Sequence, residues 1–474
     1  FSGYRDGVLL LGGAEITVHQ GHLLGLGMRP LAFPPAVDAR NALDDVHHLG
    51  GSAFAAHPTS PRAELAWSGW ELGGAWGLEV LNADSLWRRA PWPALLGGLV
   101  AYPFAPARAI AGSLDRPGEA LARWDALLRR RDAAGVAGVD AHGLPSYENL
   151  FRVLRNHVLL DAPLAGEAAR DAAAVHEALA RGRSYMAVEA LAPAGGFFFH
   201  AARGDDRWQM GDTVAPAPDL VLRAGGRLPR GARVELYRNG VRIATGEGGI
   251  ELAAREPGAY RVEVRLVGRD VPWILSNPIY VHGGVEAIVR ARRAGWPPPA
   301  PPPPAVARAL DAFGDGSAMA AESDPDTWID PDVRVAGERA PGPAGRLRFC
   351  LRQPRPDPSA VWGALVDRSR RDLSGDSGLV FDMRADGVYR IWVALWEERP
   401  GQPAGEPDWW QTSVRTSTVW RRHAIPFERL YPADTNVDDA LDLRRIVGLV
   451  FYLDPATGDA VREGSVRFEG LGVY

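Results

Sequence analysis

The chain has 474 residues, a length that predicts about three domains of roughly 150 residues each. Its 46% hydrophobic content provides for several cores, and its 54 glycines and 39 prolines favour turn-rich strands over long helical bundles. A net charge of -5 without a basic block argues against a nucleic-acid-binding surface, the single Cys350 excludes an internal disulfide and a cysteine-rich zinc site, and no apolar run approaches the ~18 residues that span a membrane.

Residues 1–190 alternate short apolar runs with helical patterns, an order that predicts βα units around a parallel sheet or barrel. The expected buried strands are Val8–Leu11, Ser52–Ala56, Gly77–Leu81 and Ala137–Val139, and the expected helices are Val37–Leu49, Pro117–Ala134 and Ala168–Arg181. Because the chain begins at Phe1 and enters a strand almost at once, we interpret it as a fragment or processed product whose N-terminal part is missing.

From residue 191 short alternating strands replace this pattern. Val234–Tyr237 and Val241–Ile243, joined by Asn239-Gly240, predict a hairpin in a small β-sandwich that ends at residue 282. The prolines of 296–304 predict a semi-rigid, extended spacer within a linker over 283–306. Residues 307–474 are again strand-like and form the last expected domain.

Side chains that bind metals follow several of the expected strands. Glu15 and His22 come after the first strand, His57 ends the run before Pro58, and Asp140 and His142 follow Val139. Functional side chains of parallel βα folds gather at the C-terminal ends of strands, so these three imidazoles and two carboxylates are candidates for one Zn, Mn or Fe site. Taken singly, His57 and the Asp-Ala-His sequence are also typical of polar loop residues.

As a set these residues resemble the motifs of a known family, the PHP (polymerase and histidinol phosphatase) metal-dependent hydrolases. The matching stretches, in order and spacing, are Ala14-Glu-Ile-Thr17, Gly21-His-Leu-Leu24, Ala56-His-Pro58 and Val139-Asp-Ala-His142. The resemblance covers residues 1–190 and implies a distorted seven-stranded barrel with two or three divalent ions. It also implies that the metal ligands are Glu15, His22, His57, Asp140 and His142.

Two departures from the family pattern are present. Val139 stands where the family usually has Ser, and the family's opening His-x-His and its Thr-Asp-His motif have no match here. We expect these motifs upstream of Phe1, and we expect this fragment to be inactive if they are absent.

Three further residues are candidates for lining a substrate pocket. Glu79 and Asn82 end a strand that faces the same rim, although a structural hydrogen-bonding role fits them equally well. His19 precedes His22 by three residues and also fits a role in a loop or in support of a ligand.

The two later segments resemble β-domains. Ser276-Asn-Pro-Ile-Tyr280 resembles the end of the small sandwich that follows the barrel in exported PHP hydrolases of the carbaryl-hydrolase type, and we expect this sandwich to pack without chemistry of its own. Residues 307–474, from Phe313 onward, resemble the galactose-binding-type jelly rolls of carbohydrate-binding modules and complex I assembly factors. Strand periodicity places Arg390, Trp392 and Trp396 on one face, which suits stacking on a sugar ring or binding of an anion; packing of both tryptophans inside the sandwich is the alternative.

We therefore predict a multidomain chain with a partial PHP-type (β/α) barrel, a small Ig-like β-sandwich and a C-terminal β jelly roll. The expected activity is hydrolysis of a phosphoester, or of a related ester or carbamate bond in a small molecule, by metal-activated water. The alternative is a non-catalytic glycan-binding or scaffold protein with an incomplete metal site. Two appended sandwiches and a proline spacer favour a periplasmic or secreted location.

Overall fold

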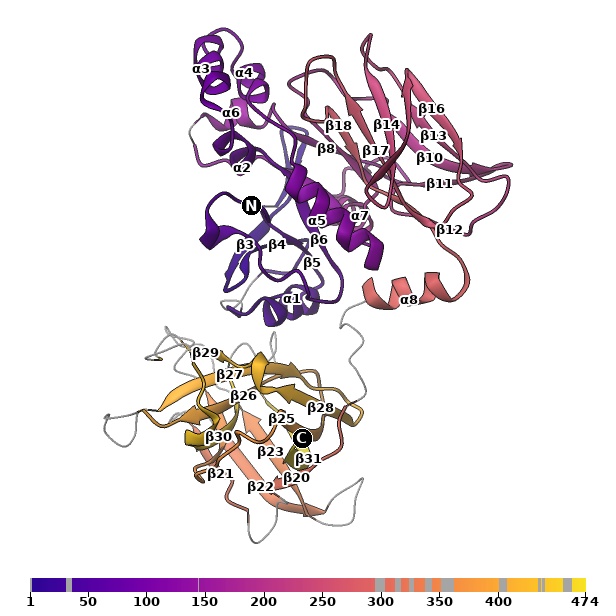
Figure 1. Ribbon diagram of the computed structural model, residues 1–474. Coiled ribbons are helices and arrows are strands. Elements are labelled where there is room, and N and C mark those ends of the chain that lie inside the picture. Colours follow the sequence, from indigo (N-terminus) through magenta and orange to yellow (C-terminus); the bar gives the residue numbers. More distant parts are fainter. Residues whose placement is uncertain are drawn as a thin grey trace. The chain divides into compact units, whose positions relative to one another are not determined.

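The computed structural model describes residues 2–30, 36–143, 145–294, 303–311, 317–323, 328–336, 343–350, 362–399, 407–433, 436, 440–454 and 463–474 (Figure 1). The chain forms two compact units. The N-terminal unit contains Phe1–Arg29 and Ala42–Pro299, and the C-terminal unit contains Pro30–Asn41 and Ala300–Tyr474.

The metal-ligand candidates come from a five-stranded sheet of the N-terminal unit. Its strands are β3 (Gly13–Val18), β4 (Gly21–Leu26), β5 (Ser52–Ala55), β6 (Trp76–Asn82) and β7 (Gly135–Gly138). They lie side by side in chain order, with β3, β4 and β5 antiparallel and β5, β6 and β7 parallel. The sheet is therefore mixed, and the described residues do not close it into a barrel.

The start of the chain differs from the expected buried strand at Val8–Leu11. β2 (Val8–Leu10) pairs with β1 (Gly3–Arg5) in a separate two-stranded hairpin, in which Val8 is 59% exposed. Glu15 also does not follow a parallel strand, because it lies inside β3 and the chain returns at once through β4.

Three helices lie where the helical periodicity predicts them: α1 (Ala39–His48), α5 (Gly118–Arg130) and α7 (Ala168–Arg181). α7 ends at Gly182, whose φ of 73° is the left-handed conformation that favours glycine at a helix C-terminus. Four further helices, which the helical periodicity does not predict, follow β6 and β7. They are α2 (Ala83–Arg88), α3 (Trp92–Ala101), α4 (Pro106–Gly112) and α6 (Tyr147–Leu150).

The β-sandwich of the N-terminal unit consists of a four-stranded and an eight-stranded sheet around a core that includes Phe199, Leu236 and Trp273. The four-stranded sheet contains β10 (Phe198–Arg203), β11 (Asp206–Gln209), β13 (Val221–Gly225) and β16 (Gly249–Ala253). The eight-stranded sheet contains β8 (Arg155–Val158), β9 (Ser184–Ala187), β12 (Thr213–Val214), β14 (Arg233–Arg238), β15 (Val241–Glu247), β17 (Gly258–Arg265), β18 (Ile274–Ser276) and β19 (Ile279–Val281).

Two features of this sandwich bear on the predicted boundaries. The hairpin at Asn239-Gly240 is present between β14 and β15, and both residues have positive φ, 52° and 85°, as such a turn requires. β9 pairs with β18, with Ala187 opposite Ile274, although β9 precedes the expected boundary at residue 190. The segment before residue 190 and the sandwich therefore share a continuous sheet, because β8 and β9 belong to the eight-stranded sheet.

A buried ion network joins α5 to the same sandwich. Arg261 on β17 is 1% exposed and donates to both carboxylate oxygens of Asp125 on α5 at 2.7 Å, and to Glu263 at 2.8 Å. Arg116, just before α5, also donates to Glu263. Burial opposes ionisation of Glu263, but the hydrogen bond from Arg116 and the charges of both arginines hold the pKa of its carboxyl below the ordinary value. The buried charges are thus fully partnered.

The expected linker over 283–306 begins instead with a helix, α8 (Gly284–Ala294). Arg290 of α8 is buried and donates to the Leu128 carbonyl at 2.7 Å and to the Asp132 carboxylate at 2.9 Å. The last carbonyls of a helix have no hydrogen-bond partner within it. The guanidinium of Arg290 supplies partners at the C-terminal end of α5. The extended-linker prediction is therefore corrected for 284–294, and within the proline run 296–304 only the last two prolines are among the described residues.

The C-terminal unit is a β-sandwich of two six-stranded sheets, which enclose Phe381, Phe451 and Phe468. The first sheet contains β20 (Arg308–Asp311), β22 (Trp328–Ala336), β23 (Pro343–Cys350), β25 (Gly378–Ala385), β28 (Arg421–Pro426) and β31 (Glu463–Val473). The second sheet contains β21 (Ala320–Ser323), β24 (Gly363–Asp367), β26 (Arg390–Glu397), β27 (Asp408–Arg415), β29 (Tyr431–Pro432) and β30 (Ile446–Leu453). This arrangement agrees with the predicted two-sheet β-domain, while Phe313 lies outside the described residues.

We expect His282, which follows β19, to make the N-terminal unit sensitive to acid. Neither ring nitrogen has a hydrogen-bond partner in the described part of the chain, and burial, reinforced by the charge of Arg290, lowers the pKa of His282 to about 4. The unfolded chain takes up this proton near pH 6.5, so we expect stability to fall as the pH drops from 6.5 to 4, by at most about 3 kcal/mol from this residue. Urea unfolding across this range should show a weaker pH dependence in His282→Gln, and an unchanged dependence would contradict the assignment.

Candidate functional sites

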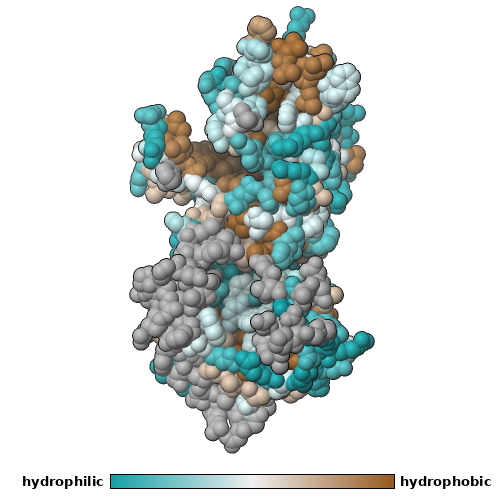
Figure 2. Space-filling view, turned by 90° about the vertical axis from the view of Figure 1, so that its left-hand side faces the viewer, coloured by the Kyte–Doolittle hydropathy of each residue, from teal (hydrophilic) through white to brown (hydrophobic). Residues whose placement is uncertain are grey.

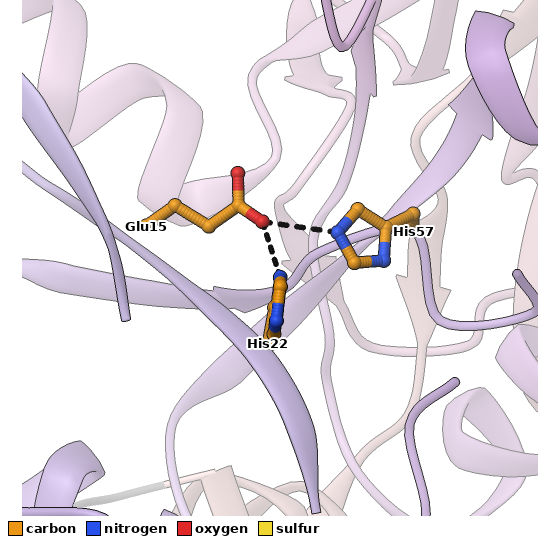
Figure 3. Close-up of side chains that lie close together, drawn as sticks. All are labelled: Glu15, His22 and His57. Atoms are coloured by element: carbon orange, nitrogen blue, oxygen red, sulfur yellow. Dashed lines mark hydrogen bonds and ion pairs between the residues drawn. The ribbon is translucent and has the colours of Figure 1, made fainter. Parts of the chain in front are cut away.

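Glu15, His22 and His57 point toward one another in the N-terminal unit (Figure 3). Glu15 Oε1 is 2.5 Å from His22 Nδ1 and 3.0 Å from His57 Nε2, and one ligand atom of each residue lies within 4.8 Å of the others. One carboxylate with two imidazoles is a donor set that suits zinc and related divalent ions. We call these three residues the metal-ligand cluster.

The register of the strands explains why the cluster forms. In the β3–β4 hairpin Thr17 lies opposite His22 and Glu15 lies opposite Leu24, so Glu15 and His22 are diagonal neighbours on one face. The backbone N–H of Ala56 donates to the His22 carbonyl at 3.0 Å, which extends the pairing of β4 with β5 by one step. His57 is the next residue and therefore arrives beside His22.

The backbone at His57 is strained and is held by a buried carboxylate. His57 has a φ of 29° and Asp140 a φ of 52°, in a region that non-glycine residues rarely adopt. Glu79 Oε2 accepts hydrogen bonds from the backbone N–H of His57 at 2.7 Å and from Asn82 Nδ2 at 2.9 Å. A Cβ on Gly138 would lie 1.6 Å from Glu79 Oε1, so only glycine leaves room for this carboxylate. Strained backbone that several surrounding contacts hold in place is typical of functional sites.

The charges of the cluster are strongly coupled. The hydrogen bond from His57, together with that from His22, lowers the pKa of Glu15 to about 2. Burial favours neutral His57, but the hydrogen bond to Glu15 and the charges of Glu15, Glu79 and Asp140 outweigh it and raise the pKa of His57. Burial raises the pKa of Glu79 to about 7. The site therefore favours positive charge between its carboxylates, either as a proton on His57 or as a bound cation.

The structure brings together three of the five predicted ligands. Asp140 follows β7 near His57 and Glu79, since its charge acts on the pKa of both, but it is not part of the group within 4.8 Å. The His142 side chain is 70% exposed, with Nδ1 2.9 Å from the Asp140 carbonyl oxygen and 3.4 Å from its carboxylate. Ligation by Asp140 and His142 stays a prediction.

The candidate pocket-lining residues have supporting positions. Glu79 and Asn82 are buried, and Asn82 Oδ1 accepts from the Ser85 N–H at 2.7 Å, which caps α2. Glu79 and Asn82 therefore have the structural hydrogen-bonding role: Glu79 accepts from the backbone N–H of His57, and Asn82 donates to Glu79. His19 is exposed in the two-residue turn between β3 and β4.

The second candidate site is a row of aromatic side chains in the C-terminal unit. Trp392 and Trp396 on β26, Trp409 on β27 and Tyr452 on β30 lie on the face of their sheet that points away from the main core. Ring centroids are 5.7 Å apart for Trp392 and Tyr452, 6.0 Å for Tyr452 and Trp409, and 5.0 Å for Trp409 and Trp396. We call these four residues the aromatic row.

Strand periodicity correctly predicts the orientation of β26. Ile391, Val393 and Leu395 pack in the core, and the three glycan-binding candidates lie on the other face. All three candidates are nonetheless buried: Arg390 is 1%, Trp392 7% and Trp396 6% exposed. Trp392 and Trp396 therefore fit the alternative in which both tryptophans pack inside the sandwich, and Arg390 is buried as well.

The accessible part of the aromatic row was missed in the sequence. Trp409 and Tyr452 are half-buried, as are Trp362 and Gln411 beside them. The pattern Trp409-Trp410-Gln411 contains the signal, because in a strand alternate residues face opposite sides and only Trp410 belongs to the core.

Polar groups flank the aromatic row in fixed orientations. The Tyr452 hydroxyl donates to Gln411 Oε1 at 2.6 Å, and the Trp392 indole N–H donates to Asp454 at 3.0 Å. The indole nitrogen of Trp396 is buried with no hydrogen-bond partner among the residues that the structure describes. The Arg368 guanidinium lies 4.7 Å from the centroid of the Trp396 ring.

No protein-family model and no curated protein matches the sequence. Among solved structures, a family 11 carbohydrate-binding module from Clostridium thermocellum, in complex with a beta-1,3-1,4-mixed-linked tetrasaccharide, is 15% identical, covers 35% of this chain and 94% of its own length, and has a TM-score of 0.29. A family 30 carbohydrate-binding module of the cellulosomal cellulase Cel9D-Cel44B of the same organism is 18% identical over 36% of this chain and 93% of its own, with a TM-score of 0.23.

Proposed function

We propose that the C-terminal unit binds a carbohydrate chain along the aromatic row. The observation that carries this proposal is the alignment of four aromatic rings on one sheet face outside the main core, with Trp409 and Tyr452 only half-buried. A sugar ring presents a face of C–H groups that packs on an aromatic ring, while its hydroxyls need hydrogen-bond partners at the edges. Trp409 and Tyr452, whose ring centroids are 6.0 Å apart, are the two rings that a sugar can reach, and the buried Trp392 and Trp396 support them.

The polar groups beside the row supply those partners. Gln411 offers an amide next to Tyr452, and both residues are half-buried. Arg368 donates to both carboxylate oxygens of Glu322 at 2.9 Å, so its charge is compensated. This balance favours a neutral glycan over an anionic one.

We expect Trp409→Ala to weaken binding of a neutral polysaccharide about tenfold or more, because one stacked ring and its buried area are lost. Affinity electrophoresis in gels that contain mixed-linked β-1,3-1,4-glucan, hydroxyethylcellulose or agarose measures the retention. Trp409 is half-buried, so the variant is expected to keep its fold.

Trp420→Ala is the matched control for this experiment. Trp420 is a half-buried tryptophan that precedes β28 in the other sheet and lies against Arg384 at 5.7 Å. Its replacement should leave retention unchanged. Equal retention of the two variants, or no retention of the unsubstituted chain in any of the gels, would overturn the proposal.

A second function is favoured by the metal-ligand cluster. We propose that Glu15, His22 and His57 hold a divalent cation and that the N-terminal unit hydrolyses a phosphoester or a related ester or carbamate. A bound ion supplies Lewis-acid activation of water and of the scissile bond. Glu15 offers a charged oxygen, Glu79 positions His57, and Asp140 lies near enough to influence both. The substrate class rests on the resemblance to PHP hydrolases, and titration of Zn²⁺ with and without His57 tests the metal site.

A unit that binds polysaccharide fits a periplasmic or secreted protein, because such polymers are found mostly outside the cytoplasm. We include this location in the proposal. Secretion of the full-length product, measured by fractionation of the source cells, tests it separately from either binding site.

A further inference from the structure

α3 is an apolar helix without a buried residue. Its side chains Trp92, Leu96, Leu99 and Val100 are 74%, 53%, 71% and 67% exposed, and Phe104 in the turn to α4 is 88% exposed. Figure 2 faces the side of Figure 1 that carries α3 and α4, and apolar side chains gather at its top. Isolated exposed apolar residues are common, but a contiguous group of this kind marks an interaction surface. We call these five residues the apolar tip.

The sequence around the apolar tip contains no charge. From Ala90 to Ala107 every side chain is uncharged, and the one hydroxyl in this stretch belongs to Tyr102. The first charged residues on either side are Arg89 and Arg108. This distribution differs from that of an ordinary surface helix, which carries polar residues along its outer face.

We propose that the apolar tip docks onto a lipid bilayer that contains anionic headgroups. α3 packs against α4 on one side, and its side chains are uncharged all round, as in helices that lipid covers. Trp92 stands at one end of α3 and Tyr102 at the other, and both residue types favour the boundary between hydrocarbon and headgroups.

The length of α3 defines how it docks. Ten helical residues measure about 15 Å, which is half of the ~30 Å hydrocarbon layer. In the part of the chain that the structure describes, no helix has both the length and the apolarity to cross a membrane. The apolar tip therefore enters one leaflet and does not span the bilayer.

Charge complementarity identifies the kind of lipid. Arg88, Arg89 and Arg108 flank the uncharged stretch and are all exposed. Arg88 pairs with Asp84 and Arg89 with Glu119, which compensates their charges, so the uncompensated charge is that of Arg108, which has no ion pair in the described part of the chain. Arginines beside an inserted apolar segment attract anionic headgroups within a Debye length. Vesicles with phosphatidylglycerol should therefore bind more strongly than vesicles of phosphatidylcholine alone.

Cosedimentation of the full chain with vesicles tests the proposal. We expect binding to vesicles of phosphatidylcholine with phosphatidylglycerol. Leu99→Glu and Phe104→Glu should each lose about tenfold in vesicle affinity, because each change removes an apolar side chain that the bilayer buries. Both residues are highly exposed, so these variants are expected to fold. Val267→Glu, at a residue that is 78% exposed on the sandwich, is the matched control and should bind as the unsubstituted chain does.

Three outcomes would overturn the proposal. They are absence of binding to every vesicle, equal loss in Leu99→Glu and Val267→Glu, and a stable dimer in solution that Leu99→Glu dissociates while vesicles have no effect. The last result would identify a second copy of this chain as the occupant.

Discussion

Replacement of Arg261 by alanine is expected to lower the free energy of unfolding of the N-terminal unit by about 3–5 kcal/mol, the cost of removing one partner from a buried ion network. The side chain is almost fully enclosed, and its guanidinium lies 4.6 Å from the Tyr237 ring centroid. Its loss leaves Asp125 without its two 2.7 Å hydrogen bonds, and among the described residues it leaves Glu263 with Arg116 and Arg265 as charged partners. Two carboxylates then lie in an environment where charge is poorly solvated.

Arg223→Ala is the matched control, since Arg223 lies in the four-stranded sheet of the same sandwich and pairs with Glu251 at 3.0 Å, with both side chains largely exposed, at 44% and 64%. We expect it to cost about 1 kcal/mol or less. Chemical denaturation followed by circular dichroism measures both variants, and hydrogen exchange in α5 shows whether the helix loses protection together with β17. Equal costs for the two arginines would show that the buried network does not hold the unit together.

The second large effect is expected at the metal-ligand cluster. His57→Ala should weaken Zn²⁺ binding more than about 100-fold, because loss of a supporting residue alone costs up to that amount and His57 is a direct ligand in the proposal. Competition with a chelating dye measures the affinity of the folded chain for Zn²⁺ alone. If binding is established, hydrolysis of phosphomonoester, carboxylate-ester and carbamate substrates is assayed with the same proteins.

Two histidine variants make this measurement decisive. His200→Ala, in β10 of the sandwich, is the neutral control and should bind Zn²⁺ as before. His142→Ala separates the ligand set implied by the PHP resemblance from the three residues that the structure brings together, because only the former predicts a large loss. Unchanged affinity in His57→Ala would contradict a metal site at the cluster.

The sequence predicts the fold best where one periodicity extends over many residues. The helix at Ala168–Arg181 coincides with α7, and the turn at Asn239-Gly240 is present, because both depend on local pattern and turn chemistry. α3 was missed because its side chains lack the polar face that marks a surface helix. The hairpin of β3 and β4 was missed because Glu15 and His22 lie within strands whose partners the sequence does not reveal.

The candidate sites show the same limit. Motif order was enough to select Glu15, His22 and His57, which the structure brings together, but it did not show that His142 extends into solvent. In β26 the period of two gave the face of Trp392 and Trp396 but not their burial, which depends on neighbours far away in the sequence, such as Tyr452. Trp409, one of the two accessible members of the aromatic row, lies opposite Trp396 where β27 pairs with β26, a pairing that the sequence does not reveal.

The pairing of β9 with β18 limits how evolution can rearrange this chain. A gene fragment that stops near residue 190 would encode β9 without the strand that covers its edge, and uncovered edges pair with other chains. A fragment that starts there would lack two strands of the eight-stranded sheet and the acidic partner of Arg261 on α5. The smallest piece that recombination can move intact therefore extends beyond residue 190, through α8. The C-terminal sandwich has its own sheets and core, but its unit also includes Pro30–Asn41, so a cut after α8 would divide that unit.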